Sequence, residues 1–91
     1  MNCIWTGHAA ERQREWQRKL GVTREEIEEV VQNPEQIVPG DQGARVAQSR
    51  RGDGLLRVPF VESGRERKIL TVYWTSRARR YWKDESHENS V

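Results

Sequence analysis

The chain has 91 residues, a length that allows one domain with one modest core. Hydrophobic residues make up 34% and charged residues 33% of the sequence, so we expect a small core and a heavily charged surface. The net charge of +2 hides a segregation, because residues 45–83 carry eleven basic and three acidic side chains, whereas residues 20–41 carry one basic and six acidic side chains.

This composition excludes several classes of protein. The longest apolar run, residues 69–74, is far shorter than the ~20 residues that a membrane-spanning helix needs, and no signal-peptide core follows Met1. The single Cys3 cannot form an internal disulfide, and two histidines with one cysteine at unrelated positions make no zinc pattern. We therefore expect a soluble cytoplasmic protein that uses no metal and no cofactor.

The first predicted element is a helix over residues 7–20. Thr6 is a favourable N-cap residue, and Gly21 suits the left-handed residue that follows a helix. The helical period places His8 and Arg12 one turn apart, at the border of the face that should be buried.

A second helix is predicted to begin after Thr23. This residue and Glu26 form a capping box, and Val22 with Ile27 forms a hydrophobic staple. The helix should end at Asn33-Pro34, because proline disfavours a helical residue before it. The short connection between the two helices predicts an αα-hairpin.

The second half of the chain is predicted to form antiparallel strands. Residues 45–51 and 55–61 are expected to pair across a Gly-Asp-Gly turn, and residues 67–75 show the clearest alternation. Pro59 lacks an N–H group, which predicts a free side or a bulge in its strand. A short segment over residues 79–82 is expected to pair with the last strand or to close the sheet.

Together these elements predict an α+β fold, in which the N-terminal αα-hairpin packs on one face of a twisted antiparallel sheet of three or four strands. Residues 1–83 form the single domain, and the polar residues 84–91 are expected to be a disordered acidic tail. The other face of the sheet is left free to bind a ligand.

A basic and aromatic run occupies residues 73–83. Cations that contact phosphates, interleaved with aromatic rings on which unpaired bases stack, are typical of proteins that bind single-stranded RNA or DNA. The alternative is that some of the aromatic residues belong to the core and that the arginines form a solvated surface. The predicted nucleic-acid-binding residues are Arg45, Arg57, Arg79, Arg80 and Lys83.

His8 and Arg12 have the chemistry that cleavage of RNA requires. Attack by the 2′-hydroxyl needs proton transfer near neutral pH, which histidine supplies, and a cation beside the charged phosphorane, which arginine supplies. A histidine at the start of a helix also serves as a capping or half-buried structural residue. The two residues by themselves leave both interpretations open.

Three motifs, in this order, resemble a family of small bacterial domains of unknown function. They are His8-Ala9 with Arg12, the sequence GVTREEI leading to Asn33-Pro34, and the sequence ILTVY at residues 69–73. The resemblance covers about residues 7–83. That family is grouped with the RelE/ParE-like toxins and similar compact ribonucleases, which carry the active site on a sheet face, so the resemblance implies a RelE/ParE-like fold.

The resemblance also implies six catalytic residues, which are His8, Arg12, Thr71, Tyr73, Arg77 and Tyr81. His8 would act as general acid or base, while Arg12 and Arg77 would stabilise the phosphate. One of the two tyrosines would position the RNA base or share in proton transfer, and the threonine would orient a partner group. The implied partners are an RNA substrate and an antitoxin protein.

Two further functions stay open. One is a nucleic-acid-binding module without catalysis. The other is a protein-interaction domain whose basic sheet docks an acidic or helical partner, for which ParE-like relatives suggest DNA gyrase.

Overall fold

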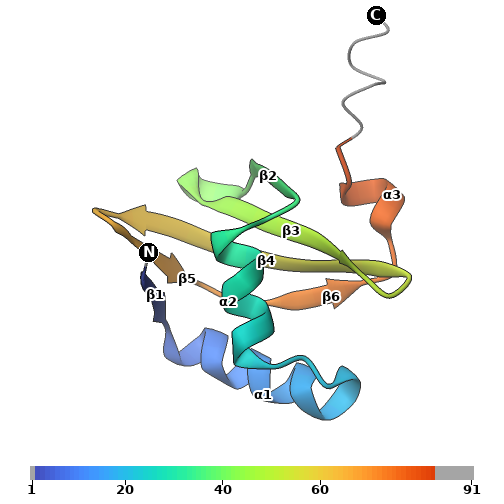
Figure 1. Ribbon diagram of the computed structural model, residues 1–91. Helices are drawn as coiled ribbons and strands as arrows, with labels where there is room; N and C mark the ends of the chain where they lie inside the picture. Colours follow the sequence, from blue (N-terminus) through green and yellow to red (C-terminus); the bar gives the residue numbers. More distant parts are fainter. Residues whose placement is uncertain (1, 84–91) are drawn as a thin grey trace, which may run out of the picture.

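The computed structural model describes residues 2–83 and confirms an α+β fold (Figure 1). In this part of the chain, three α-helices accompany a six-stranded sheet. The elements in chain order are β1 (Asn2–Trp5), α1 (Gly7–Leu20), α2 (Arg24–Gln32), β2 (Gln36–Pro39), the short turn η1 (Asp41–Gly43), β3 (Arg45–Arg51), β4 (Gly54–Ser63), β5 (Glu66–Ile69), β6 (Tyr73–Thr75) and α3 (Ala78–Tyr81). The disordered tail predicted for residues 84–91 lies outside the described residues.

The sheet is mixed, with the strand order β1-β5-β4-β3-β2 and with β6 paired to β4. β1 runs parallel to β5, and the other pairs are antiparallel. The prediction of three or four antiparallel strands is therefore wrong, because it omits β1 and β2. Each of these strands has only four residues, too few for alternation to mark a strand in the sequence.

Both predicted helices form, with the predicted N-caps. The hydroxyl groups of Thr6 and Thr23 each accept a hydrogen bond of 3.1 Å from the N–H three residues on, and Gly21 has the left-handed φ of 72°. The carboxylate of Glu26 pairs with Arg51 of β3, which ties α2 to the sheet. Figure 1 shows α2 across the sheet and at a steep angle to α1, not side by side with it as in an antiparallel hairpin.

The face of the sheet that α2 covers, called the inner face below, carries the core. Buried side chains of α2 meet alternating side chains of β4 there, as the apolar patterns of both elements predict. They are Ile27, Val30 and Val31 of α2 and Leu56, Val58 and Phe60 of β4. The opposite face, called the outer face below, carries the other side chains of these strands, which include Gln48 and Arg50 of β3, Leu55 and Arg57 of β4, and Tyr73 of β6.

The strand predicted over residues 67–75 is broken into β5 and β6 by a bulge. Phe60 pairs with Ile69 and Arg57 pairs with Tyr73, so three steps along β4 match four steps along its partner. The bulge lies opposite Pro59, which has no N–H to donate and whose carbonyl accepts from the Leu70 N–H at 2.9 Å. The proline predicted a free side or a bulge in its own strand, but β4 is continuous and the extra residue lies in the partner segment opposite the proline. The extra residue changes which side chains face inward after Ile69.

The last described element is the helix α3, where the sequence predicted a strand segment over residues 79–82. Alanine and arginine are strong helix formers, and the chain turns away from the sheet after the three-residue strand β6. α3 lies over the outer face, because the Gln48 side chain donates to the Tyr81 carbonyl at 3.0 Å and the Gln36 side chain accepts from the Lys83 N–H at 3.0 Å. The outer face is therefore partly covered, not fully open.

Candidate functional site

Four of the six predicted catalytic residues line one surface depression. His8 and Arg12 come from α1, Thr71 from the bulge segment and Tyr73 from the start of β6. The depression has a volume of about 320 Å³, and its other lining residues are Glu15, Trp16, Lys19 and Val72. Residues that are more than 50 positions apart in the sequence thus surround one space.

The positions of these side chains follow from how α1 is attached to the sheet. The Thr6 hydroxyl, which caps α1, also donates to the Ile69 carbonyl at 2.9 Å. Near the other end of the helix, the Trp16 indole donates to the Val72 carbonyl at 3.1 Å. These two bonds hold α1 against the bulge segment on both sides of Thr71. Because the bonds involve backbone groups of the segment, the depression is built into the fold.

The depression contains both free and paired charged groups. The Arg12 guanidinium contacts the Glu15 carboxylate at 2.7 Å, and this hydrogen bond lowers the pKa of Glu15 below its ordinary value. The Lys19 ammonium lies 5.2 Å from the centre of the Trp16 ring. His8 is exposed, and its imidazole makes no hydrogen bond within residues 2–83. The imidazole is therefore accessible to a ligand that enters the depression.

Tyr73 connects the depression to a polar network on the outer face. Its hydroxyl oxygen accepts a hydrogen bond from Nη1 of Arg57, while Nε of Arg57 donates to Gln48 at 2.9 Å. Gln48 in turn donates to Gln36 at 2.8 Å. Arg57 is only 7% exposed, so its guanidinium serves this network and does not form the open phosphate contact that the sequence suggests.

Burial raises the pKa of Tyr73 above its ordinary value of 10.0, and it outweighs the opposing effect of the Arg57 charge. The neighbouring Tyr81 and Asp41 also favour the neutral phenol. Tyr73 therefore keeps its proton at neutral pH. Because Arg57 donates to the phenol oxygen, the phenol proton stays available for a ligand.

The other predicted site residues lie outside this depression. Arg77, Arg79 and Arg80 are exposed on and before α3, and Lys83 follows it. The Tyr81 ring packs on the Arg57 guanidinium, whose central carbon is 4.0 Å from the ring centre. Arg45 is paired with Glu62 at 2.7 Å. Apart from Arg45 and the buried Arg57, the predicted residues thus form two groups, one at α1 and one at α3.

Sequence reasoning missed several residues of the depression and of the outer-face network. Glu15, Trp16 and Lys19 follow Arg12 at intervals of about one turn, so the helical period alone could have included them. Gln48 is fully buried at the centre of the outer-face network, and no signal in the sequence distinguishes it from an exposed glutamine.

Within residues 2–83, no three histidine, cysteine, aspartate or glutamate side chains cluster as metal ligands would. None of the helices in the same residues is both long enough and apolar enough to cross a membrane. Comparisons with protein-family models, with curated proteins and with solved structures give no match to this chain. What the site can do therefore follows from its own residues.

Proposed function

We propose that this chain is an RNA-binding protein of RelE/ParE-like fold and toxin type, which cleaves RNA without a metal ion and is neutralised by an antitoxin partner. The observation that carries the proposal is the depression shared by His8, Arg12, Thr71 and Tyr73. It combines an accessible imidazole, two cationic side chains and a phenol that keeps its proton. These are the groups that transfer of a phosphoryl group to a 2′-hydroxyl requires.

In the proposed reaction, His8 accepts the proton of the 2′-hydroxyl as the 2′-oxygen attacks phosphorus. The bond from phosphorus to the 5′-oxygen breaks, and Tyr73 donates its proton to that leaving oxygen. The products are a 2′,3′-cyclic phosphate and a free 5′-hydroxyl, and a proton returns from His8 to the phenolate through water. Arg12 and Lys19 stabilise the charge on the phosphorane, and Thr71 orients one of the catalytic side chains. No atom changes its oxidation state, so the reaction needs no oxidant or reductant.

The test is cleavage of single-stranded RNA by the purified protein in EDTA. His8→Ala and Tyr73→Phe should each lower the rate about 100-fold or more, because each removes one proton-transfer group. Arg14→Gln is the matched control, since Arg14 is an exposed cation of α1 that does not line the depression. Circular dichroism and melting temperature show whether each variant is folded. Wild-type rates in both folded site variants would remove the proposed mechanism.

The toxin assignment has its own test in cells. Inducible expression of the wild type should stop growth and degrade RNA, and His8→Ala should remove both effects. Growth arrest with intact RNA in the wild type would contradict RNA cleavage as the cause and would favour a protein target.

A second function is nucleic-acid binding without cleavage. The arrangement that favours it is the group of exposed arginines at α3, Arg77, Arg79 and Arg80, which lie apart from the depression of His8. Binding should then persist in His8→Ala. Replacement of each phosphate-contacting arginine should reduce the salt slope of binding by about one unit. If the single substitution His8→Ala abolished RNA binding, this second function would be contradicted.

A further inference from the structure

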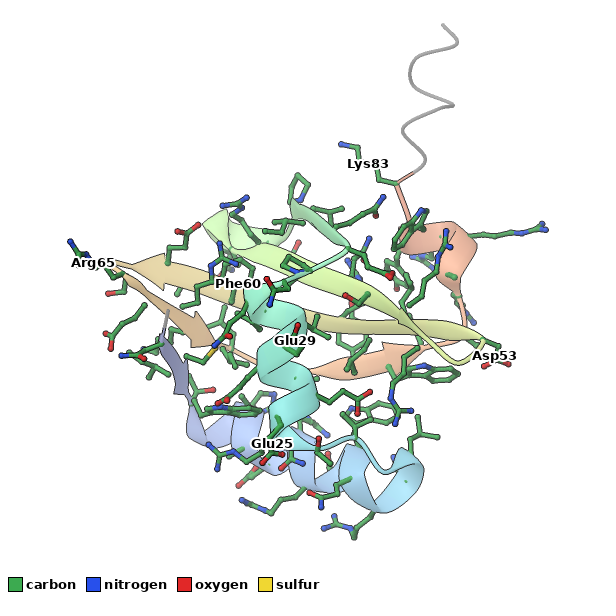
Figure 2. All side chains as sticks on the ribbon, viewed as in Figure 1. Glu25, Glu29, Asp53, Phe60, Arg65 and Lys83 are labelled. Atoms are coloured by element: carbon green, nitrogen blue, oxygen red, sulfur yellow. The ribbon has the colours of Figure 1, made fainter. Side chains whose placement is uncertain are left out.

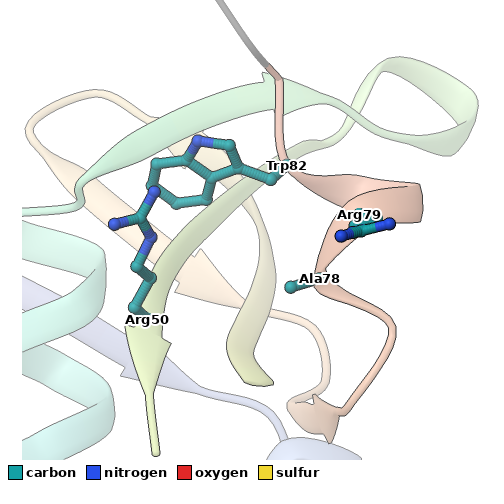
Figure 3. Close-up of a pocket in the computed structure, with 4 residues that line it drawn as sticks. All are labelled: Arg50, Ala78, Arg79 and Trp82. Carbon is teal, nitrogen blue, oxygen red and sulfur yellow. The ribbon is translucent and has the colours of Figure 1, made fainter. Parts of the chain in front are cut away.

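A groove on the outer face lies beside α3 and shares no lining residue with the depression of His8. It has a volume of about 430 Å³ and is lined by Arg50 of β3, Ala78 and Arg79 of α3, and Trp82. Figure 3 shows the Arg50 side chain reaching up to the Trp82 indole, with Ala78 and Arg79 across from them. The central carbon of the Arg50 guanidinium lies 4.5 Å from the centre of the indole.

The surroundings of the groove are strongly basic. A second depression shares Ala78 and Arg79 with it and continues along residues 76–80, with Asp53 as its one acidic lining residue. Within residues 2–83, none of Arg50, Arg77, Arg79 and Arg80 forms an ion pair. The charge of the groove therefore fits an anionic ligand.

The shape of the lining groups narrows the class of ligand. The Arg50 guanidinium lies over the Trp82 ring, and unpaired nucleobases stack on aromatic rings and on guanidinium planes. An acidic peptide would be attracted by the charge, but its carboxylate side chains do not stack on a flat surface. Cations beside a stacking surface are the combination that single-stranded nucleic acid requires.

The groove is also connected to the depression of His8. Across the outer face, the Arg57 guanidinium lies 5.4 Å from the Tyr73 ring and 4.0 Å from the Tyr81 ring. Tyr73 lines the depression of His8 at one end of this row, and Trp82 follows Tyr81 at the other end. Because Arg57 is only 7% exposed, this row is an internal contact and not a binding path, and it links the two places through the protein.

We infer that the groove is a second RNA subsite, in which one unpaired base of a single-stranded RNA stacks on the Arg50–Trp82 pair while Arg79 contacts a phosphate. The choice of RNA as ligand rests on the proposed function, but the subsite does not depend on cleavage. It predicts that a bound RNA strand is held at a nucleotide distant from the bond that is cut.

The test is the binding of a fluorescein-labelled 2′-O-methyl oligoribonucleotide of about ten residues to the full-length protein, followed by anisotropy at low salt. The methyl groups block attack by the 2′-oxygen, so binding is measured without cleavage. Trp82→Leu should weaken binding about tenfold, whereas Trp82→Phe keeps a flat ring and should bind within about twofold of the wild type. Arg50→Lys keeps the charge, loses the plane and should also weaken binding. The control is Arg14→Lys on α1, which should bind like the wild type.

Cleavage of unmodified RNA, measured in parallel, separates this inference from the proposed function. The subsite predicts that Trp82→Leu raises KM and leaves kcat unchanged, whereas His8→Ala lowers kcat and leaves binding unchanged. If the RNA is not cleaved but its binding still depends on Trp82 and Arg50, the proposed ribonuclease activity is wrong and the subsite stands. Wild-type affinity in both Trp82→Leu and Arg50→Lys would overturn the subsite, and so would equal loss of binding in Trp82→Leu and Trp82→Phe. Polyglutamate could also displace the RNA equally well from the wild type and from Trp82→Leu. That result would assign the groove to an acidic protein and would overturn the RNA subsite as well.

Discussion

The inner and outer faces of the sheet are built by different interactions. The inner face is covered by the nine-residue helix α2 and filled with aliphatic and aromatic side chains. The outer face is covered in part by the four-residue helix α3, and side-chain amides, an arginine and tyrosines hold that cover in place. The first arrangement gains its stability from removal of apolar surface from water. The second depends on hydrogen bonds with modest net stability, which a ligand can exchange for its own.

Charge separates the two faces as well. Figure 2 shows Glu25 and Glu29 on α2, and both are exposed. The exposed arginines of α3 belong to the opposite face. A polyanion is therefore repelled by the helix that covers the core and attracted to the face where the polar network lies. The net charge of the chain gives no sign of this separation.

The sharpest test of this comparison uses two neighbouring leucines. Leu55 and Leu56 are 0% and 1% exposed, but they point to the outer and the inner face, respectively. Leu56→Ala should lower the free energy of unfolding by about 2–5 kcal/mol, because the packed core cannot close the cavity. Leu55→Ala should cost less, since the short α3 can move into the space. Urea denaturation of both variants measures the difference. Equal losses would show that the two faces are equally rigid.

The next largest effect is expected from the buried amide of the outer face. Gln48→Met keeps the approximate size of the side chain but leaves the Arg57 Nε and the Tyr81 carbonyl without their partner. Stability should fall by about 1–3 kcal/mol. Amide hydrogen exchange in α3 should become faster than in α2. Gln42→Met in the exposed η1 turn is the control. Unchanged exchange in α3 would show that the amide bonds do not hold it in place.

Some features of this fold and site could be predicted from the sequence, and others could not. The N-caps and the helices α1 and α2 were predictable, because a cap acts on residues close in the chain. Pro59 indicated an irregularity in its own strand, whereas the extra residue lies in the partner segment. β1 was not predictable, since four residues become a strand only by pairing with β5, more than 60 positions away. A shared site of His8, Arg12, Thr71 and Tyr73 was expected only from a resemblance to known motifs, which also placed Arg77 and Tyr81 in it. The buried role of Gln48 depends on α3 folding over it, which no local pattern encodes.

A pH-dependent effect should follow from the raised pKa of Tyr73. The folded protein holds the phenol proton more tightly than the unfolded chain does, so this contribution to stability is fully present below about pH 10 and is lost as the pH rises through the folded-state pKa. Tyr73→Phe removes this loss. The free energy of unfolding should therefore fall more steeply with alkaline pH in the wild type than in the variant. Identical pH profiles above about pH 10 would show that Tyr73 has the same pKa in both states.

The smallest expected effect concerns the exposed ion pair at the rim of the depression. Glu15→Gln removes the carboxylate that holds Arg12 and leaves the guanidinium free for a phosphate. Stability should hardly change, since both side chains are solvated. RNA affinity at low salt should rise about threefold, because a like charge is removed beside the ligand and no internal partner competes for Arg12. Glu25→Gln on the exposed side of α2 removes the same charge from the far face and should leave affinity unchanged. An equal rise in RNA affinity in both variants would mean that binding depends only on the net charge of the protein. The depression would then not be the binding site.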